Sequence, residues 1–361
     1  MILRSITPQN FRNLDALEVS FHPQVNIVVG RNGQGKTNLL EAIYFLATTK
    51  SFRTPRTASV FRFDSASVFA AGVLHRDGVD RTLSVGLESG ETKRRALMIN
   101  GERVALATYL NAMSVFAYSS ARLDILRGSP EERRRFLDRG IASVDPSYLQ
   151  SLSRYGRVLK QRNALLHSVA MGHDAPSSLD AWDAELAEAG NVVQRARDAY
   201  AAAIAATFAQ IVARHGYHIR DVEMAYRPSL LTHIAKHRRD EIRARATLFG
   251  PQRDQLEFTF ARRPAAEVLS GGEQKMVVLL LKFAKLEIFR GRFDEPAIFL
   301  LDDVDAELDL EILEQLLRRL PSETQVFATS AKERFLTVLE ASAHRRLLLE
   351  NGRVTAADDF P

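Results

Sequence analysis

The sequence predicts an α/β fold in which both ends of the chain build one domain and an α-helical domain is inserted between them. Short apolar runs typical of buried strands occur near both ends, at 25–29, 297–301 and 325–329. The intervening segment carries long stretches with helical periodicity. A chain of 361 residues is also longer than one ordinary core accommodates. We therefore expect a head domain from residues 1–124 and 248–361 and a helical domain at 125–247.

The N-terminal part shows the patterns of strands joined by tight turns. Residues 17–21 alternate between apolar and polar, and 67–75 and 80–87 are two further strand candidates. Asp77-Gly78 lies between the last two, and Asn100-Gly101 follows a strand candidate at 96–99. Because Asp-Gly and Asn-Gly favour two-residue hairpin turns, we expect antiparallel pairing here.

The middle of the chain shows helix signals. Pro130 is followed by acidic residues, as in the first turn of a helix. Residues 147–170 and 179–214 have helical periodicity and are separated by a Gly- and Pro-containing loop at 172–178. Residues 230–246 also read as helical and basic.

Strands and helices alternate again after residue 247. Residues 256–260 are strand-like, and 275–289 form a nearly all-apolar helix, which predicts burial on every side. Together with the apolar runs at 297–301 and 325–329, this segment completes the head domain.

Composition limits the function classes. Apolar residues make up 46% and charged residues 26%, as in a soluble globular protein, and no run of about 18 apolar residues could span a membrane. The first residues lack the apolar core of a signal peptide, and the absence of cysteine excludes disulfides and thiolate metal sites, which fits a cytosolic protein. The net charge of +5 suits an acidic ligand, although an Arg-rich composition explains it equally well.

Residues 30–37 form a complete GxxxxGK[ST] phosphate-binding loop between a predicted strand and a predicted helix at 38–47. Glycines let the backbone wrap a polyphosphate with its N–H groups pointing inward, and the helix N-terminus adds positive potential. We expect Lys36 to neutralise the β- and γ-phosphates and Thr37 to bind Mg²⁺ through its hydroxyl. The residues of this loop are Gly30, Arg31, Asn32, Gly33, Gln34, Gly35, Lys36 and Thr37.

Two carboxylates follow the buried strand at 297–301, where ligands of open parallel sheets bind. Asp302 is the candidate Mg²⁺ ligand, and Asp303 is the candidate general base that polarises the attacking water. An alternative is that these residues cap the helix that follows.

A second glycine loop precedes the apolar helix and consists of Ser270, Gly271, Gly272 and Glu273. A Ser-Gly-Gly sequence at a helix N-terminus can bind an anion. It is also compatible with an ordinary capping box, in which Ser270 and Glu273 satisfy each other's backbone N–H groups.

Taken with the phosphate-binding loop, this second loop resembles the signature loop of ABC-type ATPases. The resemblance implies an ABC-type P-loop ATPase head, a mixed sheet with flanking helices. It also implies that ATP joins two heads, each signature loop contacting the γ-phosphate held by the opposite subunit, and that hydrolysis releases them. Glu307 and Asp309 resemble the D-loop of that family, and Thr329 and Ser330 stand at its switch position, where transporters carry histidine.

Four local sequences narrow the resemblance to the RecF family of bacterial DNA-repair ATPases, which are SMC-like. Residues 10–14 (NFRNL) and 35–43 (GKTNLLEAI) are similar to the opening and the extended P-loop of SMC-like proteins. Residues 128–138 (GSPEERRRFLD) and 250–254 (GPQRD) resemble blocks specific to RecF. The resemblance adds Arg12, Asn13 and Asn38 to the expected ATP-binding residues.

The RecF resemblance implies a slow ATPase used as a switch, with ATP and Mg²⁺ as ligands and an ATP-dependent homodimer around DNA. The expected DNA is single-stranded or a gapped duplex, and the expected partners are RecR, with RecO and RecA in the same pathway. A bacterial cytoplasmic location follows from the same resemblance.

Some positions depart from the family pattern. Residues 118–120 (YSS) stand where RecF sequences usually carry Pro and an acidic residue, which leaves the Q-loop residue unassigned. Gln255 follows Asp254 where a second Asp is common. The charges at 131–135 also have an alternative interpretation, as helix ion pairs on a solvated face.

DNA phosphates require clustered Arg or Lys, and the inserted domain offers two clusters. On one helix, Arg154, Arg157, Lys160 and Arg162 are spaced to share a face. The second cluster contains Lys236, Arg238, Arg239, Arg243 and Arg245. Smaller groups lie at Lys50 and Arg53 and at 93–95. No base-reading module is recognisable, so the preference should be for DNA shape or strand structure.

Two other classes of protein share some of these motifs. An ABC ATPase subunit that drives another machine, transporter-like or defence-type, would bind no DNA. The large insertion and the missing switch histidine argue against it. An SMC-type tether would need long coiled coils, and an insertion interrupted by Gly172 and Pro176 is too short for them.

Overall fold

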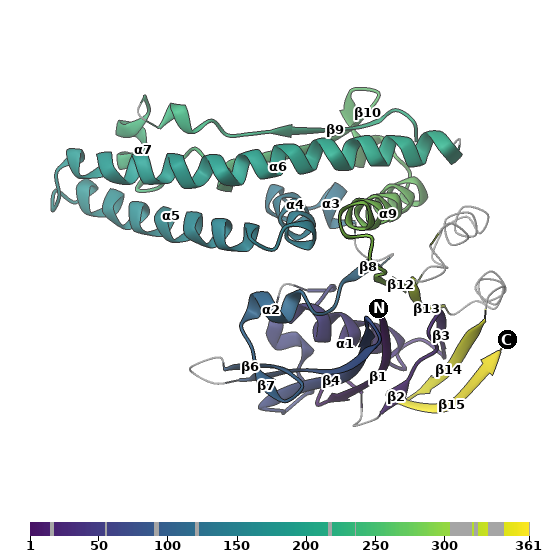
Figure 1. Cartoon of the computed structure of the whole chain (residues 1–361). Coiled ribbons are helices and arrows are strands. Elements are labelled where there is room, and N and C mark those ends of the chain that lie inside the picture. The colour runs from purple at the N-terminus through teal and green to yellow at the C-terminus, as the bar shows by residue number, and fades with distance from the viewer. Residues whose placement is uncertain are drawn as a thin grey trace. The chain divides into compact units, whose positions relative to one another are not determined.

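The computed structural model describes residues 1–14, 18–54, 56–89, 94–119, 123–215, 219–234, 236–303, 320, 324–330 and 343–360. The chain divides into two compact units, one formed by residues 1–122 and 294–361 and the other by 123–293. Figure 1 labels the elements of both units. No helix in the described ranges is long and apolar enough to cross a membrane.

The head unit contains a largely parallel sheet built from both parts of the chain. Its order is β15-β14-β3-β13-β12-β8, and only β15 runs antiparallel to its neighbour. The bounds are β3 Val25–Val29, β8 Val115–Ser119, β12 Ile298–Asp302, β13 Gln325–Thr329, β14 His344–Glu350 and β15 Arg353–Phe360. β3 therefore lies between two strands from the far end of the sequence.

A second, antiparallel sheet of the head unit has the order β2-β1-β4-β5-β6-β7. Its strands are β1 Ile2–Gln9, β2 Val19–Ser20, β4 Ser67–Arg76, β5 Val79–Glu88, β6 Arg95–Ile99 and β7 Glu102–Arg103. Asp77-Gly78 and Asn100-Gly101 form the predicted turns, with positive φ at all four residues.

Helix α1 (Lys36–Thr48) supplies much of the core of the head unit. Leu39, Ile43 and Leu46 are buried together with residues of both sheets, including Ile6 and Leu300. Burial on all sides explains why the helix is apolar around its circumference. The short helices α2 (Leu106–Leu110) and η1 (Thr57–Val60) also belong to this unit.

The second unit is a helical bundle with a small sheet. Its helices are α3 Asp124–Arg127, α4 Pro130–Val144, α5 Tyr148–Ala170, α6 Leu179–His215, α7 Arg238–Ala244, α8 Ala265–Val268 and α9 Gly271–Phe293, with single turns η2 Pro176–Ser178, η3 Leu231–His233 and η4 Pro251–Arg253. Strands β9 (Val222–Arg227), β10 (Gln255–Phe260) and β11 (Arg263–Pro264) pair antiparallel in the order β11-β10-β9. The long helices α5 and α6 run side by side (Figure 1).

The structure corrects two predictions. The second unit ends at residue 293, whereas the predicted inserted domain ended at 247, because β10 pairs with β9 and α9 packs against α6. The helix predicted at 230–246 is reduced to the single turn η3 and the seven-residue α7, and residues 234, 236 and 237 between them form turns.

Candidate functional site

The phosphate-binding loop joins β3 to α1, as the sequence predicts. Gly30, Gly33 and Gly35 have φ values of 146°, 80° and 110°, which side chains rarely adopt. No side chain caps α1 at its N-terminus, so the first N–H groups of the helix remain available to an anion. The Lys36 ammonium donates to the carbonyl oxygens of Gly30 (2.7 Å) and Arg31 (3.1 Å), and so lies over the loop.

Asp302 ends β12 and is only 3% exposed. Its Oδ1 accepts hydrogen bonds from the hydroxyls of Thr37 (2.7 Å) and Thr329 (3.0 Å), and its Oδ2 accepts one from Ser119 (3.1 Å). Burial raises the pKa of Asp302, and these three hydroxyls partly offset the rise. Strand pairing brings the groups together, because β8 and β13 both flank β12.

The oxygens of Thr37 and Asp302 fit a shared Mg²⁺. Ligands of an octahedral Mg²⁺ at 2.0–2.1 Å lie about 2.9 Å apart at adjacent positions, close to the 2.7 Å between these two oxygens. The described residues contain no cluster of three His, Cys, Asp or Glu side chains that could hold a metal ion. Mg²⁺ in nucleotide sites takes few protein ligands and completes its shell with water and phosphate oxygens.

Asp303, the candidate general base, is exposed and has a φ of 54°. Its backbone N–H donates to the Thr329 hydroxyl (2.8 Å), and that hydroxyl donates to Asp302. Thr329 at the predicted switch position thus connects the two acidic residues, and Ser330 beside it is buried. The expected D-loop residues Glu307 and Asp309 lie outside the described residues.

Arg12, Asn13 and Asn38 lie together beside the loop. Asn13 donates to the Gly33 carbonyl (3.3 Å) and accepts from the Asn38 amide (2.6 Å). Arg12 forms two hydrogen bonds, of 2.9 and 2.8 Å, with the carboxylate of Glu41, which is fully buried in α1. Sequence reasoning expected the first three residues from the family resemblance and missed Glu41.

Three more residues around the site were also missed. Ser51 donates to Glu41, and Arg53 donates to Asn38 (2.8 Å) and lies 3.5 Å from Glu41. Ser119, in the segment whose Q-loop role was unassigned, contacts Asp302. Of these, Arg53 is predicted only as part of a small basic group with Lys50. The position of Ser119 after a buried apolar strand is the one sequence signal that could have identified it.

The second glycine loop opens α9 in the helical unit. Ser270 and Glu273 form the capping box that was the alternative interpretation, with hydrogen bonds of 2.8 and 3.3 Å to each other's backbone N–H groups. Next to them, the buried Gln274 accepts from Arg127 (2.6 Å) and donates to the Leu269 carbonyl (2.7 Å). The cap leaves Ser270 exposed, and Gly271 and Gly272 half-buried.

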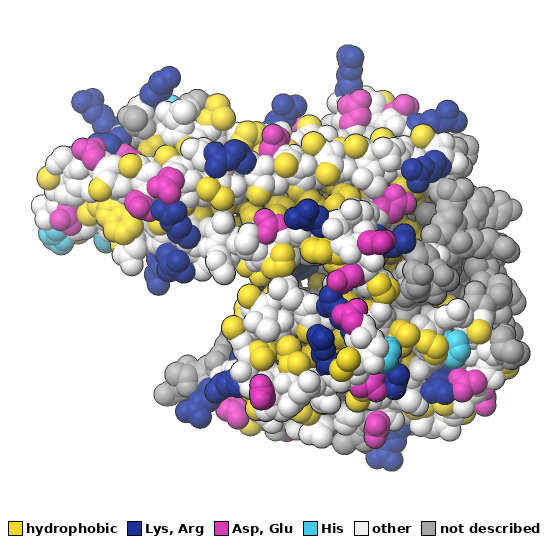
Figure 2. Space-filling view, viewed as in Figure 1, with side chains coloured by type: hydrophobic (Ala, Val, Ile, Leu, Met, Phe, Trp, Pro, Cys, Tyr) yellow, Lys and Arg dark blue, Asp and Glu magenta, His cyan; other side chains and the backbone are white. Residues whose placement is uncertain are grey.

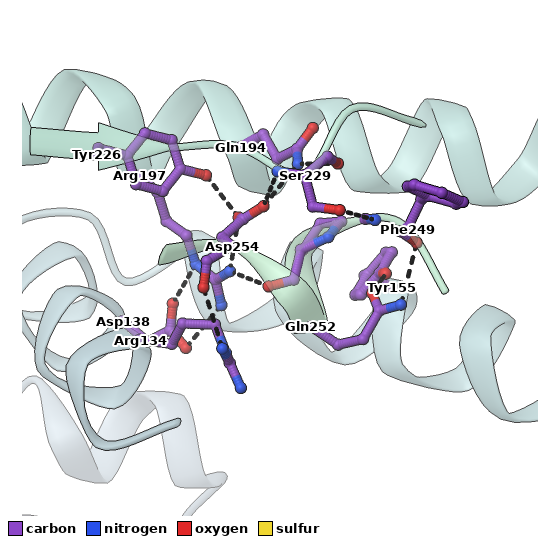
Figure 3. Close-up of polar contacts among 12 residues, drawn as sticks. Arg134, Asp138, Tyr155, Gln194, Arg197, Tyr226, Ser229, Phe249, Gln252 and Asp254 are labelled. Carbon is purple, nitrogen blue, oxygen red and sulfur yellow. Dashed lines mark hydrogen bonds and ion pairs between the residues drawn. The ribbon is translucent and has the colours of Figure 1, made fainter. Parts of the chain in front are cut away.

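The two RecF-like blocks meet in a buried polar network of the helical unit (Figure 3). Arg197 of α6 binds Asp138 at the end of one block and Asp254 at the end of the other, through N–O distances of 2.9 Å to each. Asp254 has no exposed surface and also accepts from Gln194 (2.7 Å) and Tyr226 (2.5 Å). These blocks therefore join α4 and α6 to the segment that leads into β10.

The charged residues at 131–135 include both surface ion pairs and a member of the buried network. Arg135 pairs with Glu131 and Glu132 on the surface of α4, as the helix-pair alternative predicted. Arg134 instead donates to the Asp254 carbonyl (3.0 Å), and so belongs to the buried network (Figure 3).

The candidate DNA contacts differ in how they are paired. Arg154 binds Glu185 and Glu188, and carboxylates also bind Arg238 and Arg243. Arg157 donates to Ser153 (3.0 Å), and three further residues are exposed: Lys160, Lys236 and Arg239. On the face shown in Figure 2, basic side chains of the helices stand singly, many beside an acidic one.

Arg162 does not share the exposed face, contrary to the prediction from its spacing. It has no exposed surface and lies on the inner side of α5 with Tyr155 and Leu166. Its guanidinium binds Asp183 (2.7 Å) and Glu241 (2.5 Å), so it belongs to the core of the helical unit.

Comparisons with known proteins cover the whole chain. Residues 2–353 match the family model described as the RecF/RecN/SMC N-terminal domain. The DNA replication and repair protein RecF of Geotalea daltonii is 33% identical over 369 residues, covering 98% of this chain and 100% of that protein.

Solved structures agree in fold. A structure of the recombination mediator protein RecF with ATP superposes with a TM-score of 0.88 at 24% identity, covering 100% of this chain and 98% of the other. An Smc head bound to the C-terminal winged-helix domain of ScpA gives a TM-score of 0.56 at 15% identity, with 100% and 98% coverage.

Proposed function

This chain belongs to the RecF family of DNA replication and repair proteins, and from that premise we propose that it is an ATP-dependent switch that acts on DNA. In this proposal ATP and Mg²⁺ bind at the P-loop, and two heads then dimerise. The dimer holds single-stranded or gapped DNA in the bacterial cytoplasm, and slow hydrolysis releases it. RecR, and in the same pathway RecO and RecA, are the proposed partners.

The observation that carries the proposal is the set of hydroxyls around Asp302. Thr37 comes from the P-loop helix, Thr329 from β13 and Ser119 from β8, and all three converge on one buried carboxylate. A Mg²⁺–nucleotide bound there would be held by Thr37 and Asp302, and the metal would neutralise phosphate charge. Lys36 lies within reach of the phosphates that the loop would enclose.

The roles of the acidic residues follow from their exposure. Asp302 is buried and suited to hold the metal, whereas Asp303 is exposed and can meet a water molecule. We assign Asp303 as the general base, with Thr329 fixing its backbone.

The signature loop supplies the proposed dimer contact. Ser270 is exposed at the N-terminus of the 23-residue helix α9, where backbone N–H groups favour an anion. We propose that this loop receives the γ-phosphate bound by the opposite subunit. The exposed Lys160, Lys236 and Arg239 are the first candidates for DNA phosphates, with Arg157 next, because the neighbouring arginines are paired with carboxylates.

The test measures binding to gapped duplex, blunt duplex and single-stranded DNA, with and without Mg²⁺–ATP, for the wild type and Lys36→Arg. We expect ATP to strengthen binding to gapped duplex at least tenfold, together with dimerisation seen by sedimentation, and the variant to lose both. Binding should weaken steeply with salt, since phosphate contacts release counterions. Nucleotide-dependent dimerisation without DNA affinity at modest salt would instead indicate a subunit that drives another machine.

A further inference from the structure

The turn between β14 and β15 lies directly against the phosphate-binding loop. β14 pairs in parallel with β3, and so runs beside the strand that leads into the loop (Figure 1). The turn itself is Asn351-Gly352, with φ values of 49° and 77°. This is the backbone of a two-residue hairpin turn, in which the N–H groups of both central residues are not used by the hairpin.

Both of these N–H groups bind the same P-loop residue, Gln34. The N–H of Asn351 donates to the side-chain Oε1 of Gln34 (2.6 Å), and the N–H of Gly352 donates to its backbone carbonyl (2.9 Å). The turn therefore holds Gln34 through two hydrogen bonds, one to its side chain and one to its backbone. Gln34 is the x residue immediately before the last glycine of the motif, and the motif itself places no demand on its side chain.

The fit at this contact leaves no room for further atoms. A β-carbon on Gly352 would overlap the backbone carbonyl of Asn13, and one on Gly30 would overlap the carbonyl of Leu349 at the end of β14. Asn13 in turn donates to the Gly33 carbonyl. The hairpin end thus contacts the loop at its first glycine, at Gln34 and, through Asn13, at Gly33.

The bond to the Gln34 carbonyl has a consequence on the opposite side of the loop. In a trans peptide, the carbonyl of one residue and the N–H of the next point in opposite directions. Because the Gln34 carbonyl points outward to the hairpin, the N–H of Gly35 points to the inner side, where the loop encloses phosphates. Gly35 also stands at the N-cap of α1, which no side chain caps.

We propose that the Asn351-Gly352 turn is a positioning element for nucleotide binding, which holds the P-loop open and its Gly35 N–H aimed at the phosphates before nucleotide arrives. Glycine-rich loops lose much conformational freedom when they order around a ligand. A loop already fixed by the hairpin loses less, so it binds the β-phosphate more tightly. Gln34 is the residue through which the hairpin acts. This inference rests on the ATP-binding part of the proposed function.

The chain offers a matched control for the test. Asn100-Gly101 is a second Asn-Gly hairpin turn with φ values of 52° and 80°, and a β-carbon on Gly101 would meet no atom within 4 Å. Gly101→Ala and Gly352→Ala therefore carry the same left-handed strain, but only Gly352→Ala displaces the turn from the P-loop. A third variant, Gln34→Met, keeps a side chain of similar volume and removes the side-chain amide, including the Oε1 that accepts from Asn351.

The experiment measures the affinity of the full-length variants for ATP, ADP and AMP by calorimetry, together with hydrogen exchange of the peptide covering 30–36 without nucleotide. For Gly352→Ala we expect ATP and ADP binding to weaken at least tenfold, AMP binding to stay within about twofold, and exchange of the loop to accelerate. Gly101→Ala should match the wild type in its affinities for the three nucleotides and in the hydrogen exchange of the loop. Gln34→Met should show a smaller loss of the same kind, and it decides the question if Gly352→Ala does not fold.

Equal ATP affinity in Gly352→Ala and Gly101→Ala, or a loss of affinity without faster exchange in the loop, would overturn the inference. Failure of the wild type to bind ATP would instead overturn the proposed function, so the two failures are distinguishable.

Discussion

The buried carboxyl of Asp302 illustrates how a site residue can oppose folding. Its pKa is raised by burial, so the folded chain holds the carboxyl proton more tightly than the unfolded chain does. Folded-state stability therefore falls as the pH rises above the unfolded pKa, and the loss is complete once the pH has passed the folded-state pKa. The three hydroxyls around the carboxylate reduce this cost without removing it.

We expect Asp302→Asn to raise the thermal midpoint of the nucleotide-free protein by a few degrees at pH 7, because the amide carries no charge to bury. The gain should shrink as the pH falls and the wild-type carboxyl becomes protonated. The same variant should lose Mg²⁺-dependent ATP binding. Thermal denaturation and calorimetry check both effects.

Asp303→Asn is the control for Asp302→Asn. The Asp303 side chain is exposed, so the thermal midpoint of the Asp303→Asn protein should stay within about one degree of the wild-type midpoint. A midpoint that falls in Asp302→Asn would show that the hydroxyls stabilise the carboxylate more than burial destabilises it.

At this scale, the sequence predicted the positions of the residues that belong to a motif. Lys36, Thr37 and Asp302 lie together as expected, since the spacing of the motif and the strand before Asp302 place them at one sheet edge. Glu41 acts through contacts with other segments, and no local pattern indicates it. Ser119 has only the signal of its position at the end of an apolar run. Arg162 was misplaced because helical spacing gives a face but does not say which face is buried.

Among the elements, α4 and α6 are joined by charges to each other and to the residue just before β10. Arg197 lies between Asp138 and Asp254, and its guanidinium also donates to the Pro251 carbonyl (2.6 Å). Removing one member of a buried ion pair leaves the other uncompensated, which costs about 3–5 kcal/mol. Here one arginine serves two carboxylates.

Arg197→Met should therefore destabilise the protein by about 3–5 kcal/mol, measured by urea denaturation monitored on the helical signal. Arg154→Met is the matched control, because Arg154 also binds two carboxylates but does so on the surface. Its effect should be small. A similar loss in both variants would mean that burial of the network contributes nothing.

Elements with strong periodicity were predicted well. The strand at 25–29, the strand at 325–329 and the two long helices agree with β3, β13, α5 and α6 to within a residue or two. The sequence did not predict β9, because much of the strand is accessible and it carries no clear apolar pattern. The strand is stabilised by its pairing with β10. The single helix predicted at 230–246 was wrong. The prediction rested on the basic, helix-forming composition of this segment, but only η3 and α7 are helical there.

For the whole molecule, the predicted head from both chain ends is present, and the family resemblance is confirmed by the full-length relatives. The end of the helical unit at residue 293 could not be read from the sequence, because strand–helix alternation returns at 256 while β10 still pairs with β9. Alternation identifies the class of an element and says nothing about its neighbours.

The signature loop should control whether two copies of the chain dimerise with ATP. We expect Ser270→Arg to leave ATP binding by the single chain within about twofold and to abolish ATP-dependent dimerisation and hydrolysis, because the added side chain occupies the exposed end of α9. Sedimentation with and without Mg²⁺–ATP provides the measurement. Ser177→Arg, on an exposed turn of the helical unit, should dimerise normally. If Ser270→Arg still dimerises with ATP, the loop does not meet the opposite subunit's nucleotide.

The central position of β3 also determines when the head can form during synthesis. Its two neighbours, β13 and β14, are translated about 300 residues after it, so their pairing requires closure of a very long loop. Residues 123–293 are contiguous and can fold on the ribosome while β3 still has an unpaired edge on each side. A chain cut short before β14 would carry the whole P-loop motif and yet lack the strand that flanks it.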